Sequence, residues 1–317
     1  MRNPLRVQRA FTDISQSPTA LSSAPAFDVP RMPLDLAGCE QYCRDLTRRE
    51  AKNFYWGFIA LPRPKRIAVY ALYGFAREVD DAVDVVGLGG SGSTEDDPLR
   101  PHRQRLERCL AGEADDPVMR VLAHAIERYG IPREELEALL AGVAMDLSVT
   151  RYPTWDDFQQ YCRGVASTVG RMCVRVFGYD DPLALDYAVD LGIAMQLSNA
   201  LRDVAEDFAR GRIYLPQEDL DRFGVSEATL VAGRSDPNWE ALMGFEIERG
   251  RQLFGSGLRV AGLIPRRAAA CVLTMAGIYQ AILEQLALDP SLPLRHRLSL
   301  SSRAKLSVMT RSWLRAV

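Results

Sequence analysis

Apolar residues recur along most of the chain at intervals of three and four, the spacing of one face of an α-helix, and alternating strand patterns are almost absent. We predict helices over the segments 66–86, 98–112, 115–130, 132–149, 154–178, 181–211, 238–263, 266–287 and 298–316. The pattern therefore predicts one all-α domain, residues 34–317, with about nine to eleven helices around a central apolar cavity.

Local signals mark several of the expected helix ends. Pro132, followed by acidic residues, is typical of a first helical turn. Thr154 is placed as an N-cap, with Asp157 three residues later, and Gly211 closes the longest predicted helix. Residues 1–33 hold arginine, serine and proline without a continuous apolar stretch. We interpret them as a disordered lead-in and not as a secretory signal.

The composition narrows the possible functions. Hydrophobic residues make up 47% of the 317 positions, which is enough for a sizeable core. The 39 basic and 41 acidic side chains nearly balance, so net charge indicates no nucleic-acid partner. The six cysteines show no zinc-ligand spacing and are interpreted as buried reduced thiols. No uninterrupted apolar run reaches the ~18 residues of a membrane span, and we expect a cytoplasmic protein.

An acidic run interrupts the apolar pattern in the segment NALRDVAEDFARGRIYLP. Asn199, Asp203 and Asp207 are spaced four apart and share one face of the predicted helix. Like charges at this spacing weaken a helix by roughly a few tenths of a kcal/mol. The run is therefore either a solvated face paired with neighbouring arginines or a site whose ligand offsets the repulsion.

A second acidic run, DDAVD, ends the predicted helix 66–86. Asp80 and Asp84 share a face there, and Asp81 lies beside them. If two such helices faced each other, their carboxylates would repel one another. Mg²⁺ between them would remove this repulsion, because Mg²⁺ binds oxygen ligands and commonly takes its remaining ligands from substrate phosphates. The basic residues expected to neutralise a polyphosphate are Lys52, Arg77, Arg202 and Arg212.

Three stretches in fixed order carry a resemblance: NFYWGFIALPRPKRIAVYALYGFAREVDDAVD, YCRGVASTVGRMCVRVFG and LGIAMQLSNALRDVAEDFARGRIYLP. Together they resemble the signature blocks of the squalene/phytoene synthase family, whose members join two prenyl diphosphates head to head. The resemblance covers residues 35–317 and implies the single-domain helical bundle of the isoprenoid synthases.

The resemblance implies roles for individual residues. The expected ligands of Mg²⁺, or of Mn²⁺ as a substitute, are Asp80, Asp81, Asp84, Asn199, Asp203 and Asp207. The residues expected to hold diphosphate are Lys52, Asn53, Arg77, Arg202, Arg212 and Tyr214. The residues expected nearest the reacting carbons are Tyr73, Arg77, Tyr161 and Tyr279, although each tyrosine also fits a packed core. Many relatives carry a hydroxyl where this chain has Ala51, so that contact to phosphate is absent.

The resemblance favours one reaction within the family: the joining of two farnesyl diphosphates into presqualene diphosphate for squalene and hopanoid biosynthesis. The alternative is a phytoene synthase, which joins two geranylgeranyl diphosphates in carotenoid biosynthesis. A squalene or dehydrosqualene synthase is a further alternative, ranked after it. With no dinucleotide fingerprint, NADPH is not expected. Expected partners are downstream isoprenoid-pathway enzymes and, peripherally, the inner membrane. A non-catalytic helical relative is the competing class, against which the intact acidic residues argue.

Overall fold

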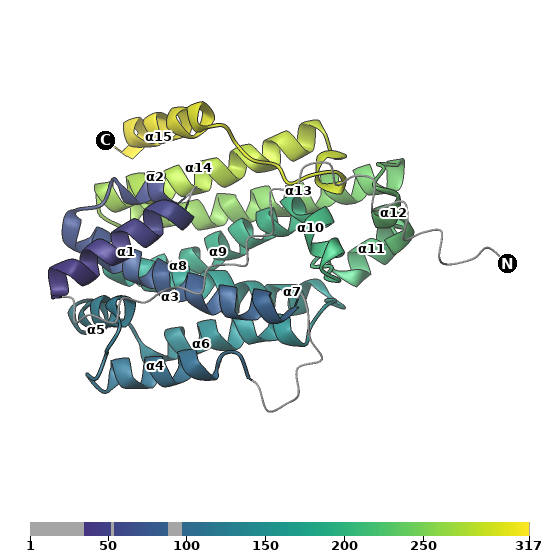
Figure 1. The fold of residues 1–317 in the computed structure, drawn as a ribbon. Coiled ribbons are helices and arrows are strands. Elements are labelled where there is room, and N and C mark those ends of the chain that lie inside the picture. Colours follow the sequence, from purple (N-terminus) through teal and green to yellow (C-terminus); the bar gives the residue numbers. More distant parts are fainter. Residues whose placement is uncertain (1–34, 52–53, 88–96, 317) are drawn as a thin grey trace. The chain divides into compact units, whose positions relative to one another are not determined.

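A computed structural model describes residues 35–51, 54–87 and 97–316, and the unit Asp35–Val317 is compact (Figure 1). The described residues contain fifteen α-helices and no β-strand, only an isolated bridge between Arg151 and Ile213. The predicted all-α fold is confirmed. The predicted lead-in, residues 1–33, lies outside the described residues.

The helices follow one another along the chain. They are α1 (Leu36–Glu50), α2 (Tyr55–Phe58), α3 (Arg63–Gly87), α4 (Arg100–Leu110), α5 (Pro117–Tyr129), α6 (Arg133–Ala144), α7 (Trp155–Cys162), α8 (Thr168–Phe177), α9 (Leu183–Arg202), α10 (Val204–Ala209), α11 (Gln217–Phe223), α12 (Glu227–Ala232), α13 (Pro237–Gly257), α14 (Arg266–Leu288) and α15 (Ser302–Ala316). The predicted number of helices was too low, because α2, α10, α11 and α12 are only four to seven residues long. Helices this short contain too few apolar positions to show a helical period in the sequence.

Two segments predicted as single helices are divided. Residues 154–178 form α7 and α8 with a π-helical turn, Arg163–Ser167, between them. At this turn the backbones touch: a Cβ on Gly164 would lie 2.7 Å from Gly142 Cα, so both glycines are needed for the close approach of α6. The start of α7 is as predicted, because Thr154 and Asp157 form a complete capping box.

The segment 181–211 is divided at an acidic residue. Asp203 has φ −102° and ψ 12°, which ends α9 and starts α10. Backbone hydrogen bonds still run from Asp203 N to Asn199 O and from Asp207 N to Asp203 O, both 2.9 Å long. The spacing predicted for the acidic face therefore survives, although the three residues do not share one regular helix.

Helix α9 lies at the centre of the fold, packed against α8, α13 and α14, while α3 lies across from it (Figure 1). Five of the six cysteines are buried and all six are free thiols, as predicted. Helix α14 is long and apolar enough to cross a membrane, with a mean hydropathy of 1.4 over its best stretch. Half of that stretch is buried, and the helix packs between α13 and α15. We therefore describe α14 as a core helix.

Candidate active site

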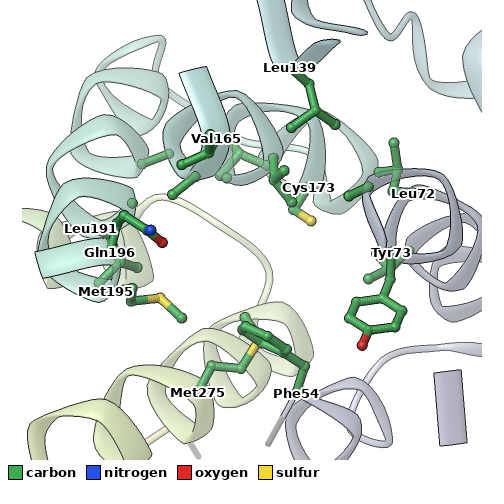
Figure 2. Close-up of a pocket in the computed structure, with 18 of the residues that line it drawn as sticks. Phe54, Leu72, Tyr73, Leu139, Val165, Cys173, Leu191, Met195, Gln196 and Met275 are labelled. Atoms are coloured by element: carbon green, nitrogen blue, oxygen red, sulfur yellow. The ribbon is translucent and has the colours of Figure 1, made fainter. Parts of the chain in front are cut away.

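A cavity of about 360 Å³ lies between α2, α3, α8, α9 and α14. In Figure 2, Leu72 and Tyr73 from α3 face Leu191 and Met195 from α9 across this space. The remaining walls are also mostly apolar; they include Phe54, Phe58, Val69, Leu139, Val143, Val165, Cys173, Val174, Phe177, Ala188, Val260, Val272 and Met275. The predicted central apolar cavity therefore exists.

Polar side chains gather at one end of the cavity. Arg77 and Asp80 come from α3, and Gln196 and Asn199 come from α9. Asn199 donates an amide hydrogen bond to Gln196, 3.2 Å away, while its own Oδ1 is buried without a hydrogen-bond partner. The ends of two helices distant in sequence thus meet at this polar end.

The first acidic run surrounds an arginine. Arg77 forms ion pairs with Asp81 at 2.5 Å and with Asp80 at 3.7 Å. Asp80 is half-buried and lines the cavity. Burial raises the pKa of Asp80 to about 7, the neighbouring Asp84 adds to the shift, and Arg77 opposes it.

The second acidic run is paired in a similar way. Asp203 forms ion pairs with Arg202 at 2.5 Å and with Arg297 at 3.1 Å. Burial raises the pKa of Asp207 to about 7, Asp203 adds to the shift, and Arg210 opposes it. Both acidic runs therefore hold a carboxyl group whose charge the protein alone does not fully offset.

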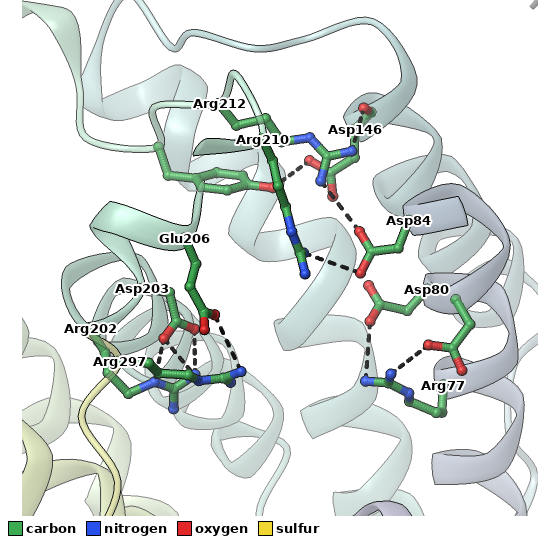
Figure 3. Close-up of polar contacts among 12 residues, drawn as sticks. Arg77, Asp80, Asp84, Asp146, Arg202, Asp203, Glu206, Arg210, Arg212 and Arg297 are labelled. Atoms are coloured by element: carbon green, nitrogen blue, oxygen red, sulfur yellow. Dashed lines mark hydrogen bonds and ion pairs between the residues drawn. The ribbon is translucent and has the colours of Figure 1, made fainter. Parts of the chain in front are cut away.

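Arginines connect the two runs across the site. Arg210 and Arg212, in the segment after α10, each place a guanidinium nitrogen 3.4 Å from the Asp84 carboxylate on α3 (Figure 3). Arg212 is buried and also donates a hydrogen bond to the Asp146 backbone oxygen at 3.1 Å. These two ion pairs join the segment that follows the second acidic run to the first acidic run on α3.

The predicted tyrosines form two separate groups. In the first group, Tyr161 and Tyr214 stack with ring centroids 5.2 Å apart, and both donate hydrogen bonds to the Asp146 carboxylate, at 2.9 and 2.8 Å. Burial raises the pKa of Tyr161 well above its usual value, and Asp146 acts in the same direction. Tyr161 is therefore a neutral hydroxyl whose proton points at a carboxylate.

The second group lies on another wall of the cavity. Phe54 contacts Tyr73 at 6.2 Å and Tyr279 at 6.0 Å between ring centroids. Burial raises the pKa of Tyr279, while Arg202 and Asn199 oppose the shift. Burial also raises the pKa of Tyr73, against the effect of Arg77. Both tyrosines are thus neutral and present aromatic surface to the cavity.

The structure divides the predicted residues into those in the cavity and those at its rim. The cavity is lined by Tyr73, Arg77, Asp80, Tyr161, Asn199 and Tyr279. The others do not line it and lie in the ion-paired region of Figure 3 and its surroundings: Asp81, Asp84, Arg202, Asp203, Asp207, Arg212 and Tyr214. Lys52 and Asn53 lie outside the described residues.

Sequence reasoning missed Asp146, Arg210, Gln196 and Arg297. Asp146 lies in a single 3-10 turn after α6, with no second acidic residue beside it to draw attention. Arg297 lies almost a hundred residues after Asp203 in the chain, so no local sequence pattern predicts their contact. Only Arg210 carried a signal, since it belongs to the basic residues after the second acidic run.

The donor set fits a divalent cation. Carboxylates and an unpartnered amide oxygen are the ligands that Mg²⁺ prefers. A cation would favour the ionised forms of Asp80 and Asp207, against the burial and the neighbouring carboxylates that raise the pKa of both groups. Within the described parts of the chain, no three His, Cys, Asp or Glu side chains already converge to hold a metal ion. This arrangement suits ions that take some of their ligands from water and from a substrate.

Comparison with known proteins assigns the class. The family model of squalene/phytoene synthases matches residues 47–309, so the chain belongs to the squalene/phytoene synthase family. Phytoene synthase of Mycobacterium tuberculosis is 36% identical over 83% of this chain and 86% of its own length. The 15-cis-phytoene synthase of Synechocystis is 36% identical over 87% of this chain and 85% of its own.

Solved structures share the fold. A dehydrosqualene synthase in complex with ligand is 28% identical and superposes with a TM-score of 0.81, covering 89% of this chain and 98% of its own. Squalene synthase HpnC from Alicyclobacillus acidocaldarius is 31% identical with a TM-score of 0.74, covering 83% of this chain and 98% of its own. Enzymes of this family condense two prenyl diphosphates head to head and use a divalent metal. The protein is a prenyltransferase-type enzyme of isoprenoid biosynthesis.

Proposed function

We propose that this enzyme joins two geranylgeranyl diphosphates into phytoene. The sequence pattern alone favoured presqualene diphosphate synthesis and gave the phytoene reaction as the alternative. The observation that carries this proposal is the 36% identity to phytoene synthases over more than four fifths of the chain. The cavity supports the same class of reaction, because its apolar walls end at a group of arginines and carboxylates.

The reaction begins when one allylic carbon–oxygen bond breaks and diphosphate leaves. Arg77, Arg202 and Arg212 would bind the leaving diphosphate by charge-assisted hydrogen bonds; in the structure each of them is ion-paired with an aspartate of the two acidic runs. Mg²⁺, held by Asp80, Asn199 and the rim aspartates, would supply Lewis-acid neutralisation of the departing charge. Arg202 and Arg212 are buried, and packing around them limits their reorganisation as the bond breaks.

The allylic carbon then bonds to the double bond of the second chain, and loss of a proton closes a cyclopropane. The apolar walls exclude water, which would otherwise capture the cation. Tyr161 lines this cavity and donates to Asp146, so its oxygen can accept the proton while its own proton passes to the carboxylate. The departed diphosphate is the competing proton acceptor.

The path to phytoene continues from this cyclopropyl diphosphate. The second diphosphate leaves, the carbon skeleton rearranges, and a second proton is lost to give a conjugated triene. No hydride is consumed, and each molecule of phytoene forms with the release of two diphosphates and two protons. NADPH is accordingly not required.

Presqualene diphosphate synthesis from two farnesyl diphosphates is the second candidate. It is favoured by the 31% identity and 0.74 TM-score to squalene synthase HpnC. That reaction stops at the cyclopropane and releases one diphosphate for each pair of substrates.

Product analysis separates the two candidates. The purified protein is incubated with Mg²⁺ and either geranylgeranyl or farnesyl diphosphate, and products and released diphosphate are measured. A C40 triene with two diphosphates per pair, at a kcat/KM at least tenfold above that for farnesyl diphosphate, is expected. Presqualene diphosphate with one diphosphate per pair would establish the second candidate instead. Squalene that forms only with NADPH would refute both.

A further inference from the structure

The last part of the chain has an unusual distribution of charge. Residues 290–317 contain six lysines and arginines and no aspartate or glutamate, in a protein whose total charge is close to balance. Arg297 belongs to this part, and its charge is paired with that of Asp203. The other charges lie mostly on α15, which therefore presents a local positive surface.

Packing fixes which side of α15 faces the protein. At Gly277 on α14, a Cβ would lie 2.7 Å from Val308 Cγ1 and 3.8 Å from Ser312 Oγ, so the two helices touch closely there. Lys305 and Ser312 are buried on the same side. The side chains on the opposite side of α15 are thereby directed away from the fold.

The outward side of α15 combines apolar and cationic groups. Leu306 is 48% exposed, Trp313 is 40% exposed and Leu314 is 76% exposed. Exposed arginines separate and flank them: Arg303, Arg311 and Arg315. None of these three arginines has an ion pair within the described residues. We call these six residues the α15 face.

The α15 face lies over the wall of the cavity. Helix α15 packs on α14 and α2 (Figure 1), and these helices contribute Tyr279 and Phe58 to the cavity lining. The segment before α15 also reaches the rim through Arg297. A surface that bound the α15 face would therefore lie beside the part of the enzyme that takes up the prenyl chains.

We propose that the α15 face docks onto a bilayer surface that carries anionic lipid. Indole and leucine side chains partition into the boundary between headgroups and acyl chains, while arginines beside them pair with anionic headgroups. Residues 290–317 contain no aspartate or glutamate, so no acidic side chain of this segment repels anionic lipid. A nucleic acid would use the arginines but leave the two leucines and the tryptophan without a counterpart.

Vesicle binding tests the proposal without any substrate, so its outcome is separate from that of the proposed function. The protein is mixed with vesicles of phosphatidylcholine alone or with 30% phosphatidylglycerol, and bound protein is measured by flotation. Binding to the anionic vesicles is expected, weakening as salt rises. Trp313 is the one tryptophan exposed among the described residues, so its emission should shift to shorter wavelength on binding and the shift should vanish in Trp313→Phe.

Two triple variants provide the matched comparison. Arg303→Glu/Arg311→Glu/Arg315→Glu should lose roughly 100-fold in affinity for the anionic vesicles, about fivefold for each arginine. Arg48→Glu/Arg128→Glu/Arg234→Glu changes three other exposed arginines that lack an ion pair within the described residues, and should bind as the parent does. Both should keep the thermal midpoint of the parent and its turnover in detergent micelles.

Three results would overturn the proposal: equal binding to neutral and anionic vesicles, equal loss in both triple variants, or no emission shift from Trp313. Tighter binding to duplex DNA than to the anionic vesicles, abolished in the α15 triple variant alone, would assign the surface to nucleic acid and also refute it.

Discussion

The Asp146 carboxylate accepts a hydrogen bond from the hydroxyl of Tyr161, with 2.9 Å between Asp146 Oδ2 and Tyr161 Oη. Its other oxygen accepts from Tyr214 at 2.8 Å, and its backbone oxygen accepts from Arg212. One residue thus sets the orientation of a cavity tyrosine, a rim tyrosine and a rim arginine. Burial raises the pKa of Asp146, while both tyrosines and Arg212 oppose the shift.

Asp146→Asn should lower kcat about 10- to 100-fold and change KM little, because the amide keeps the size of the side chain but cannot take up a proton from Tyr161. Steady-state kinetics on the preferred substrate measure this. Asp186→Asn is the matched comparison, since it makes the same change at an exposed carboxylate on α9 outside the site, and it should keep the kcat of the parent. A normal kcat in Asp146→Asn would exclude Asp146 from the proton transfer.

Asp80→Ala and Asp203→Ala should each reduce diphosphate release at least 1,000-fold, because each removes a carboxylate from one of the two acidic runs that would hold Mg²⁺. The thermal midpoint of Asp80→Ala should equal or exceed that of the parent, since like-charge repulsion with Asp84 is relieved. Asp203→Ala should unfold at a lower temperature than the parent, because it leaves the buried Arg202 guanidinium without its ion pair. Chelation of divalent metal from the parent should give the same loss of activity.

Asp186→Ala serves as the control for these two variants, because Asp186 is an exposed carboxylate on α9 remote from the acidic run. It should retain the activity of the parent. Activity of Asp80→Ala or Asp203→Ala within a factor of ten of the parent would show that the metal ligands are wrongly assigned.

Cys173→Phe should narrow the cavity, because the Cys173 thiol on α8 faces into it (Figure 2). The longer geranylgeranyl chains should be affected more than farnesyl chains, with kcat/KM for the longer substrate reduced at least tenfold more. Competition between the two substrates in one mixture measures this ratio directly. Cys173→Ser keeps the volume and should leave the ratio unchanged; equal losses for both substrates would refute the role of cavity width.

Glu246 should give the folded protein a pH-dependent stability unrelated to the active site. It is fully buried on α13, and burial raises its pKa to about 8, although Arg249 at 2.8 Å opposes the shift. The folded state therefore binds a proton that the unfolded state releases. The free energy of unfolding should fall between pH 4.5 and pH 8, with a slope of at most about 1.4 kcal/mol per pH unit.

Denaturant unfolding of Glu246→Gln tests this, because the amide stays neutral and similar in shape. The variant should lose this part of the pH dependence and be more stable than the parent at pH 8. An unchanged slope in Glu246→Gln would mean that Glu246 is ionised in the folded state at neutral pH.

Much of the fold followed from local signals. The intervals between apolar residues predicted the long helices, and the Thr154 and Asp157 pair predicted the start of α7, because both depend on residues close together in the chain. The same holds for the acidic faces: residues four apart lie on one face of a helix, and this spacing survives even at Asp203, where α9 ends and α10 begins. Sequence alone therefore predicted that each run would present its carboxylates together.

The tertiary structure decided what those runs contact. The approach of Arg212 to Asp84 depends on how α3 and the segment after α10 pack, and no local pattern encodes a contact between residues 128 apart. Asp146 meets Tyr161 only because α6 and the π-helical turn touch through Gly142 and Gly164. The sequence by itself determined the helices and their chemical faces, which arise from short-range geometry. Which faces meet was decided by packing, because burial of apolar surface brings together segments that the chain holds far apart.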